Sequence, residues 1–189
     1  MDLNLSWDLF ILVFFGVVIA YSFIIGRNQT LKVITATYVG ILCSDAIGNL
    51  FSKYLADSAA FLRFLKLFSI GNAEQATAFF KVFILILFIV LLAVRGAFSY
   101  DAQDARPFGL KITISLLLGI MSAGLMMSAM LIFVSGNSLV IDVAAANPLV
   151  EVYNQSRLVR TMVDYSNLWF FVPGLSVILL SLFGKKSAG

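Results

Sequence analysis

The chain has 189 residues, of which 61% are hydrophobic and only 12% are charged, about half the charged share of soluble domains. So few charges cannot cover so much apolar surface in water, which excludes a soluble globular protein. A formal net charge of +3, scattered along the chain, gives no basic face for nucleic acid, and the absence of histidine removes the commonest acid–base group and metal ligand. We therefore predict a non-enzymatic protein without a cofactor or a metal site.

Five apolar segments are long enough to be candidates for crossing a bilayer. A hydrocarbon core of about 30 Å requires about 20 apolar residues in a helix, or about 17 at the short end. The segments are Leu9–Ile25, Leu31–Phe51, Ala78–Phe98, Gly109–Val134 and Leu168–Phe183. We expect an all-α integral membrane protein with four to five spans in one domain, residues 1–189. The last segment contains Pro173 and Gly174, so it either crosses the membrane or lies flat in the interface.

The first segment follows an acidic N-terminal region with no Lys or Arg, so we interpret it as a retained span and not as a cleaved signal peptide. Trp7 before it and Arg27 after it are predicted interfacial anchors. The residues from Gly26 to Thr30 form a short polar turn, which makes the first two spans antiparallel neighbours.

The second segment carries more polar residues than the first. Tyr38, Asp45 and Asn49 share one helical face, and Gly40, Ser44 and Gly48 form a ladder of small residues on an adjacent face. Such ladders let helix backbones approach closely in membranes. We therefore expect this helix to be surrounded by protein.

Asp45 is the sharpest candidate for a functional residue, because ionised carboxylates inside membranes are costly and rare. One interpretation is a proton or cation site lined by Asp45, Asn49, Ser44 and Tyr38. A second is a neutral or hydrogen-bonded residue that only sets packing. A third is a shifted helix that places Asp45 near the interface. Without a second intramembrane acid or base in view, the structural interpretation is favoured.

Two amphipathic helices are predicted between the spans, over residues 59–69 and 149–165. The third span has Lys81 near one end, where its side chain can reach toward the headgroups, and Arg95 as an anchor at the other. Trp169 is a further predicted anchor. The fourth span is predicted to pack tightly through small residues, namely Gly119, Ala123, Gly124 and Ser128.

The order of these features resembles the colicin V production protein (CvpA) family of bacterial inner-membrane proteins. The resemblance lies in Trp7-Asp8-Leu9 opening a span that ends in Ile25-Gly26-Arg27, and in Leu31-Lys32-Val33-Ile34 starting a polar helix that holds Tyr38-Val39-Gly40. It implies a four-span core, an inner-membrane location and a role in envelope homeostasis or toxin-linked export. It implies no catalytic residues.

These observations predict a subunit or scaffold of a larger membrane assembly. The expected partners are the lipid bilayer and either other membrane subunits or further copies of the chain, and no nucleic acid. The alternative is a small channel or a proton- or cation-coupled transporter that uses Asp45. The acidic N-terminal region and the basic Lys185-Lys186 tail favour an N-terminus outside the membrane.

Overall fold

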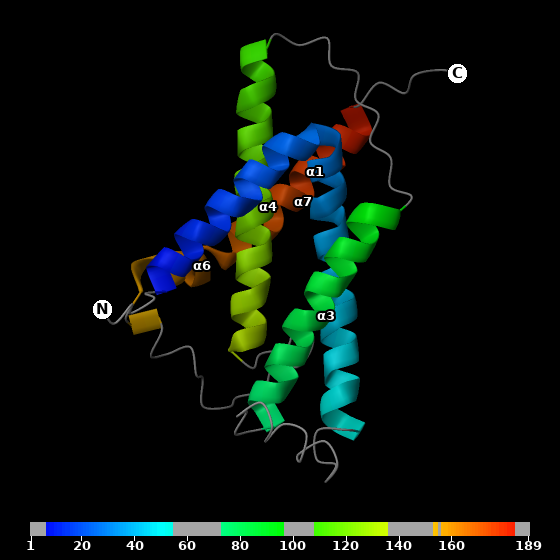
Figure 1. Cartoon of the computed structure of the whole chain (residues 1–189), viewed down its shortest axis with the longest axis vertical. Coiled ribbons are helices and arrows are strands. Elements are labelled where there is room, and N and C mark those ends of the chain that lie inside the picture. The colour runs from blue at the N-terminus through cyan, green and yellow to red at the C-terminus, as the bar shows by residue number, and fades with distance from the viewer. Residues whose placement is uncertain (1–6, 55–72, 97–107, 136–152, 155, 184–189) are drawn as a thin grey trace.

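The computed structural model describes residues 7–54, 73–96, 108–135, 153–154 and 156–183, and within these residues the secondary structure is entirely helical. The helices are α1 (Trp7–Tyr54), α3 (Ala73–Arg95), α4 (Phe108–Val134), α6 (Arg157–Asp164) and α7 (Ser166–Phe183). Figure 1 shows α4 running through the length of the bundle, with α1 and α3 on one side. The predicted helix over 59–69 lies outside the described residues, and the one over 149–165 is described only in part.

Three described helices are long and apolar enough to cross a membrane, namely α1, residues 75–95 of α3 and residues 109–134 of α4. A fourth candidate is the pair α6 and α7, which meet at a bend of 60°. The predicted spans match these helices in kind, although α3 begins at Ala73, before the predicted start at Ala78. The membrane-spanning character predicted from hydropathy is therefore supported by the described helices.

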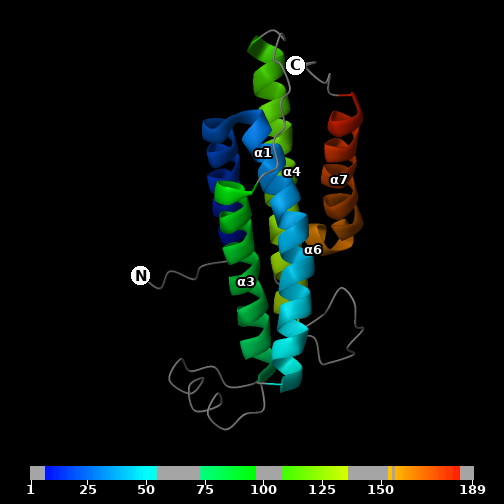
Figure 2. The same ribbon diagram turned by 90° about the vertical axis from the view of Figure 1, so that its right-hand side faces the viewer.

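Helix α1 contains the first two predicted spans in one element. Its only non-helical residue is Gly26, with φ 78° and ψ 172°, a backbone conformation that is essentially restricted to glycine. The predicted five-residue turn was therefore too long, because the helix resumes at Arg27. Thr30, which is fully buried, donates its hydroxyl to the Gly26 carbonyl at 2.9 Å and lies 3.4 Å from that of Ser22. In Figures 1 and 2 the chain reverses direction at this break.

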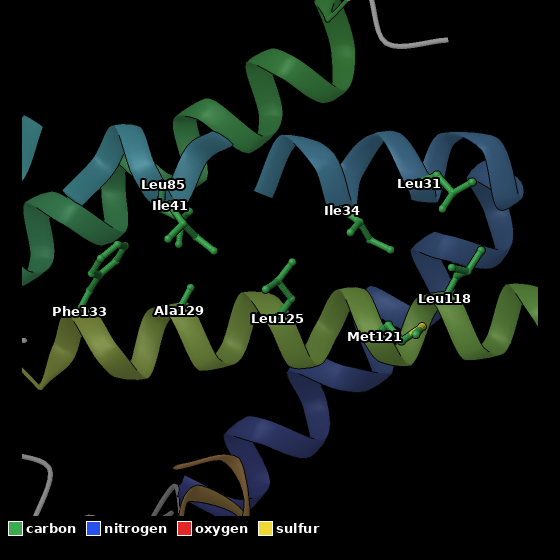
Figure 3. Packing of buried hydrophobic residues seen from close by; sticks show 9 residues of the cluster. All are labelled: Leu31, Ile34, Ile41, Leu85, Leu118, Met121, Leu125, Ala129 and Phe133. Carbon is green, nitrogen blue, oxygen red and sulfur yellow. The ribbon is translucent and has the colours of Figure 1, made fainter. Parts of the chain in front are cut away.

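Helix α4 forms the centre of the bundle, with every residue from 121 to 129 buried. One of its faces joins the larger apolar cluster, which α1 and α3 complete (Figure 3). This cluster consists of Leu31, Ile34, Ile41, Leu85, Leu118, Met121, Leu125, Ala129 and Phe133. A second cluster joins Met127 and Leu131 of α4 to Ile11 of α1 and to Val159 and Met162 of α6. The prediction that the second and fourth apolar segments form the interior agrees with this burial.

The predicted small residues lie where helices approach closely. A Cβ atom at Gly119 would stand 3.2 Å from Ser22 Cβ, and one at Gly40 would stand 3.3 Å from a methyl carbon of Leu85. Ala123 and Ser128 are both buried within α4. These contacts depend on small side chains, because a larger one would push the neighbouring helix away.

Candidate functional site

A buried ion pair joins α1 to α3. Lys81 Nζ lies 2.7 Å from Asp45 Oδ1 and donates a hydrogen bond to it. The two side chains are only 5% and 1% exposed. Lys81 was expected to extend toward the membrane surface, but its side chain turns into the bundle instead. The acid that seemed isolated in the sequence therefore has a partner of opposite charge.

Gly48 makes room for the Lys81 side chain. It lies three residues after Asp45, so both project on the same side of α1. A Cβ atom at Gly48 would stand 2.3 Å from Lys81 Cγ and 2.7 Å from Lys81 Cε. The lysine stem thus lies flat across the α1 backbone, and this path brings its ammonium to the carboxylate. The predicted packing glycine is also a determinant of the ion pair.

The third helix, α4, covers the pair. The Phe133 ring centroid lies 5.6 Å from Lys81 Nζ, within the range of cation–π attraction. Phe133 itself is fully buried, so an apolar wall separates the charges from solvent on this side. Within the part of the chain that the structure describes, there is no group of three or more Asp, Glu, Cys or His that could hold a metal ion.

The other residues of the predicted polar site do not converge on Asp45. Ser44 is fully buried, and its hydroxyl donates to the Ile41 carbonyl of its own helix at 3.1 Å. Asn49 is half-buried on the next turn. Tyr38 is directed toward α7. The structure therefore separates the predicted set into an Asp45–Lys81 site and a Tyr38 site.

Tyr38 contacts α7 at its proline. The Tyr38 hydroxyl donates a hydrogen bond to the Phe170 carbonyl and accepts one from the Gly174 backbone N–H. In an unbroken helix the N–H of 174 would bond the carbonyl of 170 directly. The phenol oxygen therefore sits within the backbone ladder beside Pro173, whose ring interrupts the helix. Residues 38 and 174 lie far apart in the sequence, and no local motif announces this contact.

The predicted anchors occupy different environments. Trp7 is half-buried, Arg95 is exposed and Arg27 is buried. Trp169 packs on Gly124, where a Cβ atom would stand 2.0 Å from Trp169 Cε3. Its ring also meets Phe15 edge-on, with centroids 6.1 Å apart. Trp169 therefore acts as a packing residue between α7, α4 and α1.

A polar cluster at the start of α1 was not predicted. Asp8 accepts hydrogen bonds from the Ser156 hydroxyl at 2.6 Å and from the Leu158 N–H at 3.0 Å. Ser156 also caps α6, accepting from the Val159 N–H at 3.0 Å. The cluster joins the first turn of α1 to the first turn of α6.

Next to this cluster, Tyr153 donates to Asp164 at 2.9 Å. Because this bond stabilises the protonated phenol, it raises the pKa of Tyr153. Arg160 lies over the Tyr153 ring, 5.2 Å from its centroid. These contacts gather the charged residues of α6 on its outer side.

Lys81 is the residue that sequence reasoning missed. It is the one charged residue between Glu74 and Arg95, just as Asp45 is the one charged residue between Lys32 and Lys53. Two lone charges of opposite sign, each well inside an apolar helix, were the available signal, because pairing lowers the cost of both.

Comparisons with protein-family models, with curated proteins and with solved structures found no match to this chain. The class of the protein therefore follows from its own helices and its own site. It is a helical protein with helices long enough to cross a membrane, and a buried Asp–Lys pair joins two of them.

Proposed function

We propose that this protein is an integral membrane helical bundle that serves as a non-enzymatic subunit or scaffold of a larger membrane assembly. The observation that carries the proposal is the closed Asp45–Lys81 pair. Each charge is neutralised by the other at 2.7 Å, and both are buried. A buried pair of this kind favours one arrangement of helices over others. Its role here is to hold α1 against α3.

The span count belongs to the same proposal. Because the chain reverses at Gly26, the two arms of α1, residues 7–25 and 27–54, count as two spans. With α3 and α4 they make four, and the bent pair α6 and α7 adds a fifth element. Helix α6, with its buried Val159 and Met162 and its exposed charges, is an interfacial amphipathic helix. We place the N-terminus outside.

The partners we propose are lipid, other membrane subunits or further copies of the chain, in a bacterial inner membrane. The CvpA resemblance supports a role in envelope homeostasis or export. Purification of the full chain in mild detergent, followed by size determination, tests the subunit role. Recovery with stable partners or as an oligomer is the expected result, and a chain that remains a monomer would contradict it.

The alternative function is a small channel or a proton- or cation-coupled transporter, and one observation favours it. Ionisable residues inside membrane bundles commonly mark ion pathways, and Asp45 and Lys81 are both ionisable. Flux measured in proteoliposomes distinguishes the two functions. The scaffold proposal expects no flux in the wild type, whereas a flux that Asp45→Asn abolishes would establish transport.

A further inference from the structure

We propose that a belt of charged side chains on this protein lies among the phospholipid headgroups of one leaflet, and that the Asp45–Lys81 pair is part of it. The belt, called here the charged belt, consists of Asp8, Arg157, Arg160, Asp164 and the Asp45–Lys81 pair. This inference rests on the proposed membrane location. It assigns Asp45 to the membrane interface and not to the bilayer centre.

Helix α6 provides the first argument. Val159 and Met162 on one side are buried in the second apolar cluster. On the other side Arg157, Arg160 and Asp164 are exposed. Exposed charges on a helix surface are costly in hydrocarbon, whereas an amphipathic helix in the headgroup region keeps them hydrated. Helix α6 therefore lies outside the hydrocarbon core.

The start of α1 lies at the same level. Asp8 is bonded to both Ser156 and Leu158 at the first turn of α6, at 2.6 and 3.0 Å. Trp7 precedes it and is half-buried, and tryptophan is enriched at the headgroup level. The first arm of α1 therefore enters the hydrocarbon from the level of α6.

Helix α4 serves as a ruler for the ion pair. Its residue Leu131 belongs to the cluster that holds Val159 and Met162 of α6. Its residue Phe133 lies 5.6 Å from Lys81 Nζ. Two residues of α-helix span about 3 Å along the axis. The ion pair therefore lies within about one helical turn of the level of α6.

The opposite boundary agrees with this placement. A core of about 30 Å corresponds to about 20 residues of upright helix. Counted back from Leu131, this distance reaches Lys111, the one charged residue of α4. The turn of α1 at Gly26 and Arg27 lies at the same end of the bundle (Figure 1), since Ser22 packs on Gly119 of α4. The uncharged length of α4 thus fits the hydrocarbon.

Hydropathy alone would place the membrane differently. The apolar window of α3 runs over residues 75–95, and centring it would put Lys81 about 6 Å from the mid-plane. The same depth would then place the exposed charges of α6 in hydrocarbon. With the charged belt at the interface, Phe79 lies among the headgroups, and Leu91, about 15 Å along α3 from Lys81, lies at the bilayer centre.

The charge of the belt indicates the type of headgroup. Its three cations, Lys81, Arg157 and Arg160, are matched by three acids, Asp8, Asp45 and Asp164. A belt with both signs and no net charge is complementary to zwitterionic headgroups, which also carry both. The protein therefore requires no anionic lipid to take up this depth.

Depth-dependent fluorescence quenching tests the placement on the full chain. In a Cys43→Ala background, single cysteines replace Phe79, Thr161 and Leu91, all of which are exposed, and each is labelled with one environment-sensitive dye. The labelled proteins are reconstituted in phosphatidylcholine vesicles that contain nitroxide lipids, either near the headgroup or deep in the acyl chain. We expect the shallow nitroxide to quench best at 79 and 161, and the deep one at 91.

The outcomes separate this inference from the proposed function. Deep quenching at 79 would overturn the belt placement while leaving the membrane location intact. Protein that fails to float with vesicles, with no quenching at any site, would overturn the membrane location itself. A shift of site 79 to greater depth when anionic lipid is omitted would overturn the match to zwitterionic headgroups.

A matched pair of substitutions supplies a test without labels. Phe79 and Leu91 lie on the outer side of α3 and are 64% and 51% exposed. We expect Phe79→Arg to remain in the membrane fraction at the wild-type level and Leu91→Arg to be lost from it. Equal loss of both variants would show that position 79 also lies in hydrocarbon and would overturn the placement.

Discussion

The Lys81 side chain lies across Gly48 on its way to Asp45. A Cβ atom at Gly48 would stand 2.3 Å from Lys81 Cγ, and beyond this contact Lys81 Nζ lies 2.7 Å from Asp45 Oδ1. Contact and ion pair are therefore one arrangement: the glycine sets the path of the lysine, and the path sets the charge pairing. The first two predictions test its two parts separately.

We expect Gly48→Ala to lower the free energy of unfolding by about 1–3 kcal/mol, because the lysine stem must move to accommodate the methyl group. Gly16→Ala is the matched control on the same helix, since nothing lies within 4 Å of its Cβ position. The control should be neutral or stabilising by up to about 1 kcal/mol. Thermal unfolding followed by circular dichroism in detergent measures both, and equal midpoints would refute the steric role of Gly48.

Breaking the ion pair on one side should cost more than removing it altogether. Lys81→Met leaves the Asp45 carboxylate buried without its cation, and we expect a loss of about 3–5 kcal/mol of stability. The double variant with Asp45→Asn should recover most of this loss, since neither charge remains. The same unfolding assay applies. A double variant whose loss equals the sum of the two single losses would contradict the coupling.

Gly26→Ala should destabilise the protein through the backbone alone. Nothing lies within 4 Å of a Cβ atom at Gly26, but its φ of 78° with ψ of 172° is unfavourable for any L-residue with a side chain. We expect a loss of about 1–3 kcal/mol. Gly16→Ala is again the control, because it differs only in its helical backbone. A Gly26→Ala variant as stable as the control would argue against the break in α1.

Gly124→Ala should displace Trp169. The added methyl group would stand 2.0 Å from Trp169 Cε3, so the indole must leave its place on α4, at a cost of about 1–3 kcal/mol. Tryptophan emission and its quenching by acrylamide report the displacement. Gly109→Ala on the same helix has open space around it and should leave the spectrum unchanged. An unshifted spectrum in Gly124→Ala would disprove the contact.

Tyr38→Phe should loosen α7 where Pro173 interrupts it. The substitution keeps the ring but removes the hydroxyl that bonds Phe170 and Gly174. We expect a loss of about 0.5–1.5 kcal/mol, with faster hydrogen exchange confined to α7. Thr113→Val is the control, because the Thr113 hydroxyl is exposed and bonds only its own helix. Unchanged exchange at residues 170–176 would contradict the insertion of the hydroxyl.

Hydropathy and small-residue spacing were sufficient to predict much of the fold. The apolar length of residues 109–134 predicted α4, and the small residues Gly119 and Gly124 predicted close packing, because both signals are local to one helix. The break at Gly26 was placed correctly but made too long. Lys81 was misplaced because its depth was inferred from its position along one helix.

What the sequence by itself determined is the helical, apolar character of the chain and the residues that permit close approach, since these depend on neighbours within a few turns. Only the tertiary structure decided which helices meet. The antiparallel packing of α1 and α3 brings Lys81 to Asp45, and the contacts of α4 place that pair at the level of α6. Such relationships join residues far apart in the chain, and their geometry depends on the packing of several helices at once.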